Sequence, residues 1–393
     1  MKKPSSMLKS ARINKRWTRE FVSEQVGVSV STYGRWERGS QKPGNASIDA
    51  LCKIFEMSPE ELGLAEPFAS NEKWRTEEAA AKRRISGSAP SEDPDDLEQA
   101  EALSLWAMGI ASCWLLYMSG GQAELERLLP VYLKNLARPT LSPGPDQKTA
   151  ARLTAQVYQL TALLELQRGD FIAAQMNGTQ ALVYSQLSKD WNLYIASQIH
   201  LASIFSARKR VGSALSAYND ALRRVSAGYD AVSPILHSRV FAGLGEIQAT
   251  MGREKEALQF LQLAAAVFPE KPEDDPCFSY AQCDRSMLFF YEGLVFLRLG
   301  NPKAAWDAFA QVDELKPAPP ERIRAEFLQQ KAYTSFVLGN MIQSCIYLEA
   351  AAKAAQEINS DLAFSEVYTL YEHMLALWGQ EPRMRALARL FQR

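Results

Sequence analysis

Short segments with helical spacing of apolar residues fill the first 64 residues of the chain, and clear start and stop residues separate them. The pattern predicts five short helices, over about 6–15, 18–26, 29–39, 48–55 and 58–62. Thr18, Ser29 and Ser58 are polar residues of the kind that caps helix N-termini, and Gly27 can end the second helix. Six apolar residues are expected to share one small core: Leu8, Ala11, Val22, Val26, Leu51 and Phe55.

A linker is predicted between this module and the rest of the chain. Residues 71–84 are charged and rich in alanine and are expected to be helical, whereas residues 85–96 (ISGSAPSEDPDD) have the composition of a loop. We therefore predict three parts: a helical module over 1–66, a charged helix and linker over 67–96, and a second domain over 97–393.

Beyond residue 97 small residues recur at fixed distances along the chain. The reference positions of this pattern are Gly169, Lys209, Gly252, Gly300 and Gly339. Five residues after these lie Ala174, Ala214, Ala257, Ala305 and Ser344, and small residues also recur seven before and, Val312 apart, twelve after. Small residues at fixed offsets let two antiparallel helices approach closely, and glycine at the turn accepts a positive φ. The pattern predicts stacked helix pairs.

These pairs resemble the tetratricopeptide repeat (TPR), as in RGDFIAAQMNGTQAL at 168–182 and LGNPKAAWDAFAQV at 299–312. The units are 39–48 residues apart, longer than the usual ~34. A degenerate unit over about 106–136 and a terminal helix over 361–379 are expected to extend the stack, and residues 269–276 to form an insertion. Chance spacing in an alanine-rich helical bundle is the alternative. The fold class predicted is all-α, a five-helix module followed by a TPR-like α-solenoid.

Charge is distributed unevenly along the 393 residues. Residues 1–43 contain ten Lys or Arg and three acidic residues, whereas the whole chain has a formal net charge of −1, so the remainder is acidic. A basic N-terminal module on an acidic body confines a polyanionic partner to one end. The first residues lack the apolar core of a leader, and the longest apolar run, about 106–118, is expected to be a buried helix too short to span a bilayer. Cytoplasmic localisation without membrane attachment is expected.

Metal and enzyme sites are not indicated. Of the five cysteines none forms a CxxC pair, although Cys277 and Cys283 are close enough in sequence for a redox pair to be an alternative to two ordinary thiols. The three histidines lack metal-ligand spacing. No GxxxxGK[ST], GxSxG or HExxH motif occurs, and FAGLGEIQ lies in a helical segment without a preceding strand. We expect no catalysis, no cofactor and no metal.

Residues 8–43 (LKSARINKRWTREFVSEQVGVSVSTYGRWERGSQKP) resemble the helix-turn-helix of the phage-repressor-like (XRE) regulators. Thr18-Arg19-Glu20 opens the first motif helix, Ser23 is the small residue where the helices touch, and Gly27 makes the turn. Arg19 stands where the family usually has Gln, and Tyr33 where an aliphatic residue is usual. Tyr33 and Trp36 are expected to be buried, and Gly34 to remove one base-reading side chain.

Such a motif places the N-terminal face of its second helix in the DNA major groove. Ser29, Ser31 and Thr32 can bond phosphates or base edges, and Val30 can touch a thymine methyl. Arg35 is expected to make the bidentate contact to guanine. Four further basic residues are expected to pair with phosphates: Arg12, Arg19, Arg38 and Lys42. A helical docking module that never meets DNA is the alternative.

An XRE module followed by a long TPR domain resembles, loosely, the RRNPP-type peptide-pheromone sensors. That resemblance implies quorum sensing, a homodimer, and a short peptide that binds the concave face of the solenoid. The repeat register nominates seven residues of that face: Gln156, Gln159, Ser203, Arg239, Glu246, Gln329 and Tyr333. Each is equally compatible with a solvated surface. The leading hypothesis is a ligand-gated transcriptional regulator that binds double-stranded DNA. The second is a TPR scaffold for a protein partner, in which the N-terminal module docks protein.

Overall fold

The computed structural model describes residues 5–15, 17–38, 40, 43, 45–55, 57, 62, 64, 94–226, 232–281, 283–313, 315 and 318–391. The chain divides into two units, Met1–Glu92 and Asp93–Arg393. The described residues form helices and turns, with no strand among them. This agrees with the all-α class predicted from the sequence.

Four short helices are described in the first unit: α1 (Ser5–Asn14), α2 (Arg19–Val26), α3 (Val30–Arg38) and α4 (Asn45–Phe55). The first three match the predicted helices closely, and α4 begins three residues earlier than the predicted residue 48. The predicted fifth helix, Leu62 apart, and the predicted charged helix and linker over 67–96, as far as residue 93, lie outside the described residues. Residues 94–96, predicted as linker, instead begin a long helix.

The predicted core of the first unit is confirmed. Leu8, Val22 and Leu51 are fully buried, and Val26 packs against them while partly exposed. Tyr33 and Trp36 join this core with ring centroids 6.2 Å apart, so their predicted burial is also confirmed.

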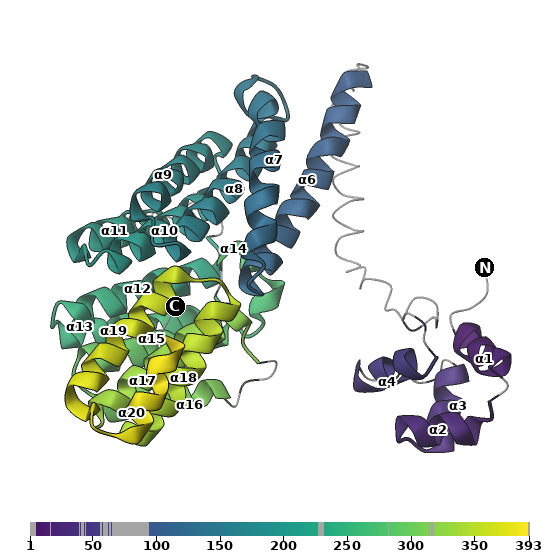
Figure 1. Ribbon diagram of the computed structural model, residues 1–393. Coiled ribbons are helices and arrows are strands. Elements are labelled where there is room, and N and C mark those ends of the chain that lie inside the picture. The colour runs from purple at the N-terminus through teal and green to yellow at the C-terminus, as the bar shows by residue number, and fades with distance from the viewer. Residues whose placement is uncertain are drawn as a thin grey trace. The chain divides into compact units, whose positions relative to one another are not determined.

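The second unit is a stack of antiparallel helix pairs, coloured from blue to yellow in Figure 1. The first pair is α6 (Pro94–Met118) with α7 (Gln122–Leu141), where the sequence predicted a degenerate unit. The following pairs are α8 (Gln147–Gln167) with α9 (Phe171–Ser188), α10 (Trp191–Ala207) with α11 (Val211–Ser226), α12 (Pro234–Thr250) with α13 (Glu254–Val267), α15 (Arg285–Arg298) with α16 (Pro302–Asp313), and α17 (Glu321–Val337) with α18 (Met341–Glu357). The end is α19 (Asp361–Trp378), α20 (Pro382–Leu387) and a 3₁₀ turn, Ala388–Leu390.

The turns within the pairs follow the predicted rule. Gly169, Gly252, Gly300 and Gly339 have φ between 74° and 77°, and Lys209 has φ 58°. The five small residues that follow them, from Ala174 to Ser344, are all 0% exposed. Positive φ reverses the chain tightly, and the small side chains bring the two helices together. The TPR-like pairing predicted from the sequence is thereby confirmed.

In the three pairs that begin with α8, α10 and α12, the first helix lies inside and the second outside. In α10 every residue from Leu193 to Ala202 is buried, whereas α13 buries only Ala257 and Ala264. The insertion predicted around residues 269–276 contains a short 3₁₀ helix (Pro272–Asp274), followed by α14 (Phe278–Ala281).

Helix α6 differs from the buried helix expected there. One face, with Ile110 and Trp114, is buried, but Leu105, Met108 and Leu115 are 68–71% exposed. By length and composition alone, the stretch Gln99–Met118 is apolar and long enough to cross a membrane. Of its most apolar 18 residues, 28% are buried. The expectation that this run is too short and buried is therefore wrong. Such a helix also occurs in proteins that never meet a bilayer.

The cysteines show no redox pair. All five are free, and Cys277 and Cys283 are 1–2% exposed. Burial raises the pKa of Cys277 to about 11 and that of Cys283 to about 12, so both remain thiols near neutral pH. The alternative of a redox pair gains no support.

We predict that Gly293→Ala destabilises the repeat domain by about 1–3 kcal/mol, because a Cβ at Gly293 would lie 2.3 Å from the ring of the fully buried Phe309. The matched control is Gly212→Ala, since no atom lies within 4 Å of a Cβ there. It should be neutral or slightly stabilising, because alanine favours helix by up to about 1 kcal/mol. Urea denaturation of the full chain measures both, and equal midpoints for the two variants would contradict this packing.

Candidate nucleic-acid interface

A tight turn between α2 and α3 sets the geometry of the N-terminal unit. The Thr18 hydroxyl accepts a hydrogen bond from the Phe21 N–H at 3.2 Å and caps α2. Gly27 has φ 74°, and its N–H donates to the Ser23 and Glu24 carbonyls at the end of α2. Ser23 is 2% exposed and donates to the Glu20 carbonyl, so it takes up little space where α2 meets its neighbours. Each of these roles was predicted from the sequence.

Three hydroxyls gather at the first turn of α3. Ser29 Oγ accepts a hydrogen bond from the Thr32 N–H at 3.1 Å, and it lies 2.9 Å from Ser31 Oγ and 2.8 Å from Thr32 Oγ1. Val30 beside them is 40% exposed. Exposed hydroxyls and one aliphatic side chain at a helix N-terminus suit phosphates and base edges, because the positive end of the helix dipole faces them.

Arg35 and Arg38 follow on the exposed side of α3, three residues apart, while Tyr33 and Trp36 lie on the buried side. The structure therefore gives α3 one apolar face and one basic face. Gly34 is buried too. The only atom within 4 Å of a Cβ built on Gly34 would be Arg38 Nη1, at 3.4 Å, so the expectation that this glycine removes a base-reading side chain stays a prediction.

A buried carboxylate takes up two of the arginines that were expected to contact DNA. Glu37 is 4% exposed, and its two oxygens lie 2.6 Å from Arg12 Nε and 2.6 Å from Arg19 Nε. Arg12 Nη1 donates to the Trp17 carbonyl at 2.8 Å, and Arg12 Nη2 to Glu37 Oε2 at 3.5 Å. The cluster ties α1, the start of α2 and the end of α3 together.

The phosphate contact expected of Arg12 is corrected by this arrangement. All three of its guanidinium nitrogens are bonded within the unit, and its side chain is 12% exposed. Arg19 is 38% exposed, so the outer part of its guanidinium can still reach a phosphate. Lys42 lies outside the described residues. The contacts that remain predictions are those of Arg19, Arg35 and Arg38 and of the α3 N-terminus.

The charge of Glu37 is stabilised by this pairing. Burial alone would raise the pKa of Glu37, but the hydrogen bonds and charges of Arg12 and Arg19 outweigh it, and the pKa is lowered. The hydrogen bond to Glu37 raises the pKa of Arg12 in turn. Sequence reasoning missed Glu37 because its partners lie 18 and 25 residues away. An acidic residue at a buried position of the predicted α3 was the available signal.

Two of the seven residues nominated for ligand binding make hydrogen bonds to neighbouring helices. Gln159 is 1% exposed and donates to Ser197 Oγ at 2.8 Å and to the Leu193 carbonyl at 3.3 Å. Gln156 accepts a hydrogen bond from Trp114 Nε1 at 3.2 Å. The assignment of Gln159 to the groove is corrected because it is buried between α8 and α10, whereas that of the half-buried Gln156 stays a prediction.

The other five lie on the inner helices α10, α12 and α17, with varied surroundings. Arg239 is 8% exposed, its guanidinium carbon lies 4.7 Å from the Tyr291 ring centroid, and its Nε and Nη1 have no hydrogen-bond partner. Burial raises the pKa of Glu246. Gln329 donates to Glu366 Oε2 at 2.8 Å, Ser203 donates to the Ile199 carbonyl, and Tyr333 is 38% exposed. Of these five, Gln329 lines a cavity between α8, α17 and α19.

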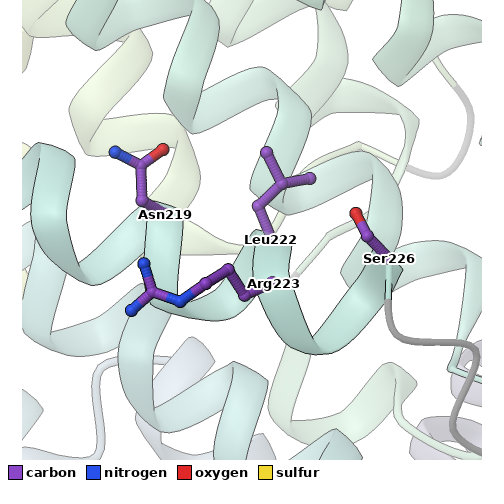
Figure 2. A pocket seen from close by; sticks show the side chains of 4 residues that line it. All are labelled: Asn219, Leu222, Arg223 and Ser226. Carbon is purple, nitrogen blue, oxygen red and sulfur yellow. The ribbon is translucent and has the colours of Figure 1, made fainter.

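An open hollow of about 500 Å³ lies on the outer helix α11, lined by Asn219, Leu222, Arg223 and Ser226 (Figure 2). All four side chains come from the last turns of one helix, and Arg223 is ion-paired with Asp220. None of the nominated residues lines it. Among the described residues no group of three or more His, Cys, Asp or Glu side chains is placed to hold a metal ion.

Residues 8–62 match the helix-turn-helix family and form an XRE-type helix-turn-helix domain. No curated protein matches the sequence. Several solved structures show similarity, among them the following two. The PlcR of Bacillus thuringiensis in complex with the peptide PapR7 and DNA is 13% identical, with a TM-score of 0.37 over 86% of this chain and 99% of that one. The Cut9–Hcn1 hetero-tetramer of the APC/C is 16% identical, with a TM-score of 0.42 over 98% of this chain and 69% of that one. Both are distant likenesses.

We predict that Glu37→Gln destabilises the N-terminal unit by about 3 kcal/mol, because it leaves the guanidinium of Arg12 buried without its counter-charge. The effect should depend on pH. A lowered carboxylate pKa contributes stability that is complete above its unfolded value, about 4.3, and is lost as pH falls through the folded value.

Urea unfolding of the full chain, followed by circular dichroism and tryptophan fluorescence at pH 7 and at pH 3, measures this difference. The control is Glu24→Gln, an exposed acidic residue of α2, which should change stability little at either pH. A Glu37→Gln variant as stable as the wild type at pH 7 would contradict the structural role of the cluster.

Proposed function

We propose that this protein is a transcriptional regulator whose helix-turn-helix domain reads a specific DNA sequence and whose repeat domain senses a ligand. The observation that supports it best is the division of α3 into a buried aromatic face and an exposed face with Arg35, Arg38 and the N-terminal hydroxyls. That division is what a recognition helix needs, since one side must pack while the other enters the major groove.

A protein-interaction scaffold is the second candidate. In that case the first unit docks protein, and the concave face of the repeats holds an extended partner. The basic exposed face of α3 favours DNA, because two arginines one turn apart match guanine edges and phosphates. The scaffold requires no sequence preference for DNA and no salt dependence.

The sensing role that we propose rests on the inner helices. Arg239, Glu246 and Gln329 carry polar groups where the surrounding helices exclude much of the solvent. Polar groups in a partly dry groove bind peptide backbones and termini better than exposed ones. A peptide is therefore the ligand class we propose, as for quorum sensing. We further propose a cytoplasmic protein without enzymatic activity.

A homodimer is part of this proposal. One small module discriminates DNA sequences weakly, and two linked modules gain effective concentration on a two-part site. The exposed apolar side chains Leu105, Met108 and Leu115 lie along one face of α6, and no charged residue stands between Glu101 and Glu124. A second copy can pack its own α6 against this face without desolvating a charge.

We expect Arg35→Ala to weaken binding to the operator by about 1–3 kcal/mol and to relax specificity at one base pair. Fluorescence anisotropy with fragments of the upstream promoter, single-base variants and several salt concentrations measures both effects. The matched variant Arg38→Ala should instead weaken all DNA similarly and lower the salt slope by about one unit. Arg253→Ala, an exposed arginine of the repeat domain, should change neither. Intact base discrimination by Arg35→Ala would show that α3 does not read the groove as assigned.

Met108→Glu should convert the proposed dimer to a monomer, since it places a charge in the apolar contact. Analytical ultracentrifugation at micromolar concentration measures it. Met176→Glu is the matched control, because Met108 and Met176 are 69% and 66% exposed but lie on different helices. A wild-type protein that sediments as a monomer with and without DNA, or binds liposomes through α6 instead, would rule the dimer out.

Ligand binding should change DNA affinity by roughly 5–150-fold, corresponding to about 1–3 kcal/mol of coupling. A solenoid sums small rotations between neighbouring units, so a ligand that bridges several units can displace its ends. DNA titrations with and without short peptides encoded near the gene test this. Equal affinities with a peptide bound would favour the scaffold.

A further inference from the structure

The two ends of the helical stack meet. Arg322 Nε on α17 donates to the Tyr117 carbonyl at the end of α6, at 2.9 Å and 205 residues away. Ser360, which caps α19, donates to Gln167 Oε1 at the end of α8, at 2.6 Å and 193 residues away. A Cβ on Gly120 would lie 3.3 Å from the Ile358 Cα. We call this contact, between α6–α8 and α17–α19, the seam.

A cavity of about 150 Å³ lies at the seam, room for about five water molecules at ~30 Å³ each. Its polar lining comes from three helices, α8, α17 and α19: Gln167, Arg322, Glu326, Gln329, Gln330 and Glu366. The remaining wall is apolar, with Phe290 and Leu362 among its residues. The size suits the end group of a larger ligand or a small molecule of a few heavy atoms.

Arg322 in this wall is buried but incompletely bonded. It is 3% exposed, its guanidinium carbon lies 4.1 Å from the Tyr117 ring centroid, and Nε donates to the Tyr117 carbonyl. Nη1 and Nη2 have no hydrogen-bond partner. A buried guanidinium with two unbonded nitrogens is unfavourable, because its charge has lost water without gaining a counter-charge.

The carboxylates nearby do not supply that counter-charge. Glu326 lies one turn along α17, and the ion pairs of the described residues do not include one between it and Arg322. Burial raises the pKa of Glu326 to about 7, and the charges of Arg322 and Arg239 oppose this rise. Glu366 accepts the amide of Gln329.

We propose that the seam cavity binds a carboxylate group, whose two oxygens accept hydrogen bonds from Nη1 and Nη2 of Arg322. The planar fork of a guanidinium matches a carboxylate in this way. The carboxylate is either the C-terminus of a peptide or a small organic acid. The inference rests on the proposed sensing role and names its ligand chemistry.

A carboxylate bound to Arg322 would also stabilise the seam. Arg322 holds the end of α6 through the Tyr117 carbonyl, and Gln167 holds the cap of α19 through Ser360. Neutralising Arg322 therefore stabilises the closed stack. Helix α6 is the first helix after the DNA-binding unit along the chain, so a ligand at the seam acts on the element through which the two units are connected.

The test uses the full-length protein, calorimetry and thermal melting. The probes are propionate and succinate at up to about 10 mM, and a pool of short peptides with free C-termini beside the same pool with C-terminal amides. We expect at least one carboxylate probe to bind and to raise the melting midpoint by several degrees. Amidation that weakens peptide binding at least tenfold assigns the site to a peptide terminus, and binding of the small acids alone assigns it to an organic acid.

Arg322→Met should weaken the bound probe at least tenfold, and Arg322→Lys should weaken it less, since lysine keeps the charge but loses the fork. Arg324→Met, an exposed arginine of the same helix, is the matched control and should bind as the wild type does. If Arg322→Met does not fold, the Arg322→Lys and Arg324→Met pair decides the question.

Failure to bind any of these probes would overturn the proposal, and so would carboxylate binding that both Arg322 variants retain. DNA binding is measured by fluorescence anisotropy on the same samples. The carboxylate site at Arg322 and the ligand gating of DNA binding can then be tested independently of each other. Carboxylate binding through Arg322 without a change in DNA affinity leaves the seam site intact and contradicts the gating. If a ligand changes DNA affinity but binds independently of Arg322, the gating is supported and the seam site is contradicted.

Discussion

Close approach of paired helices is the constraint on which the repeat domain depends. Five of the pairs, from α8–α9 to α17–α18, have a residue with positive φ at the turn and a side chain no larger than alanine or serine five residues later. With both conditions met, α8, α10 and α12 are enclosed by neighbours on nearly all sides. A helix enclosed in this way cannot leave its polar groups to water, so each polar residue on it must find a partner within the protein.

Many polar residues on these inner helices have a hydrogen-bond partner for at least one atom, but some buried atoms have none, among them Gln159 Oε1 and His200 Nδ1. Gln159 bonds Ser197 and the Leu193 carbonyl, and burial lowers the pKa of His200 to about 3, which keeps its ring neutral. Arg239 and Arg322 cannot become neutral in the same way, because a guanidinium stays protonated. Each stacks on a tyrosine and leaves two nitrogens without a hydrogen bond. A closed solenoid with buried arginine nitrogens unbonded is suited to an anionic ligand in its interior.

Local pattern sufficed to predict the helices, the turns and both caps of the helix-turn-helix, because each depends on residues a few positions apart. It placed Gly252 and Ala257 correctly at a turn and at a close helix contact. It failed where a side chain's partner is distant in sequence. Arg12 was assigned to phosphate although it pairs with Glu37, and Arg322 was overlooked although it bonds the end of α6. Helical periodicity predicts which face is buried but not which distant group meets a given charge there.

The buried pairing in the first unit bears on how the protein can bind DNA tightly. Residues 1–43 carry ten basic side chains, yet Arg12 is bonded internally at every guanidinium nitrogen and Arg19 shares Glu37 with it. An arginine that pairs with Glu37 cannot also release counterions from DNA. Each lost phosphate contact lowers the slope of log K against log salt concentration by about 0.9. Among the described residues, one copy then offers the α3 face, the outer part of Arg19 and flanking lysines such as the exposed Lys9. So small a contact set discriminates poorly among genomic sites. In the homodimer that we propose, two modules joined through their repeat domains would overcome that limit without any new base contact, and a ligand could act on the relative position of the two modules.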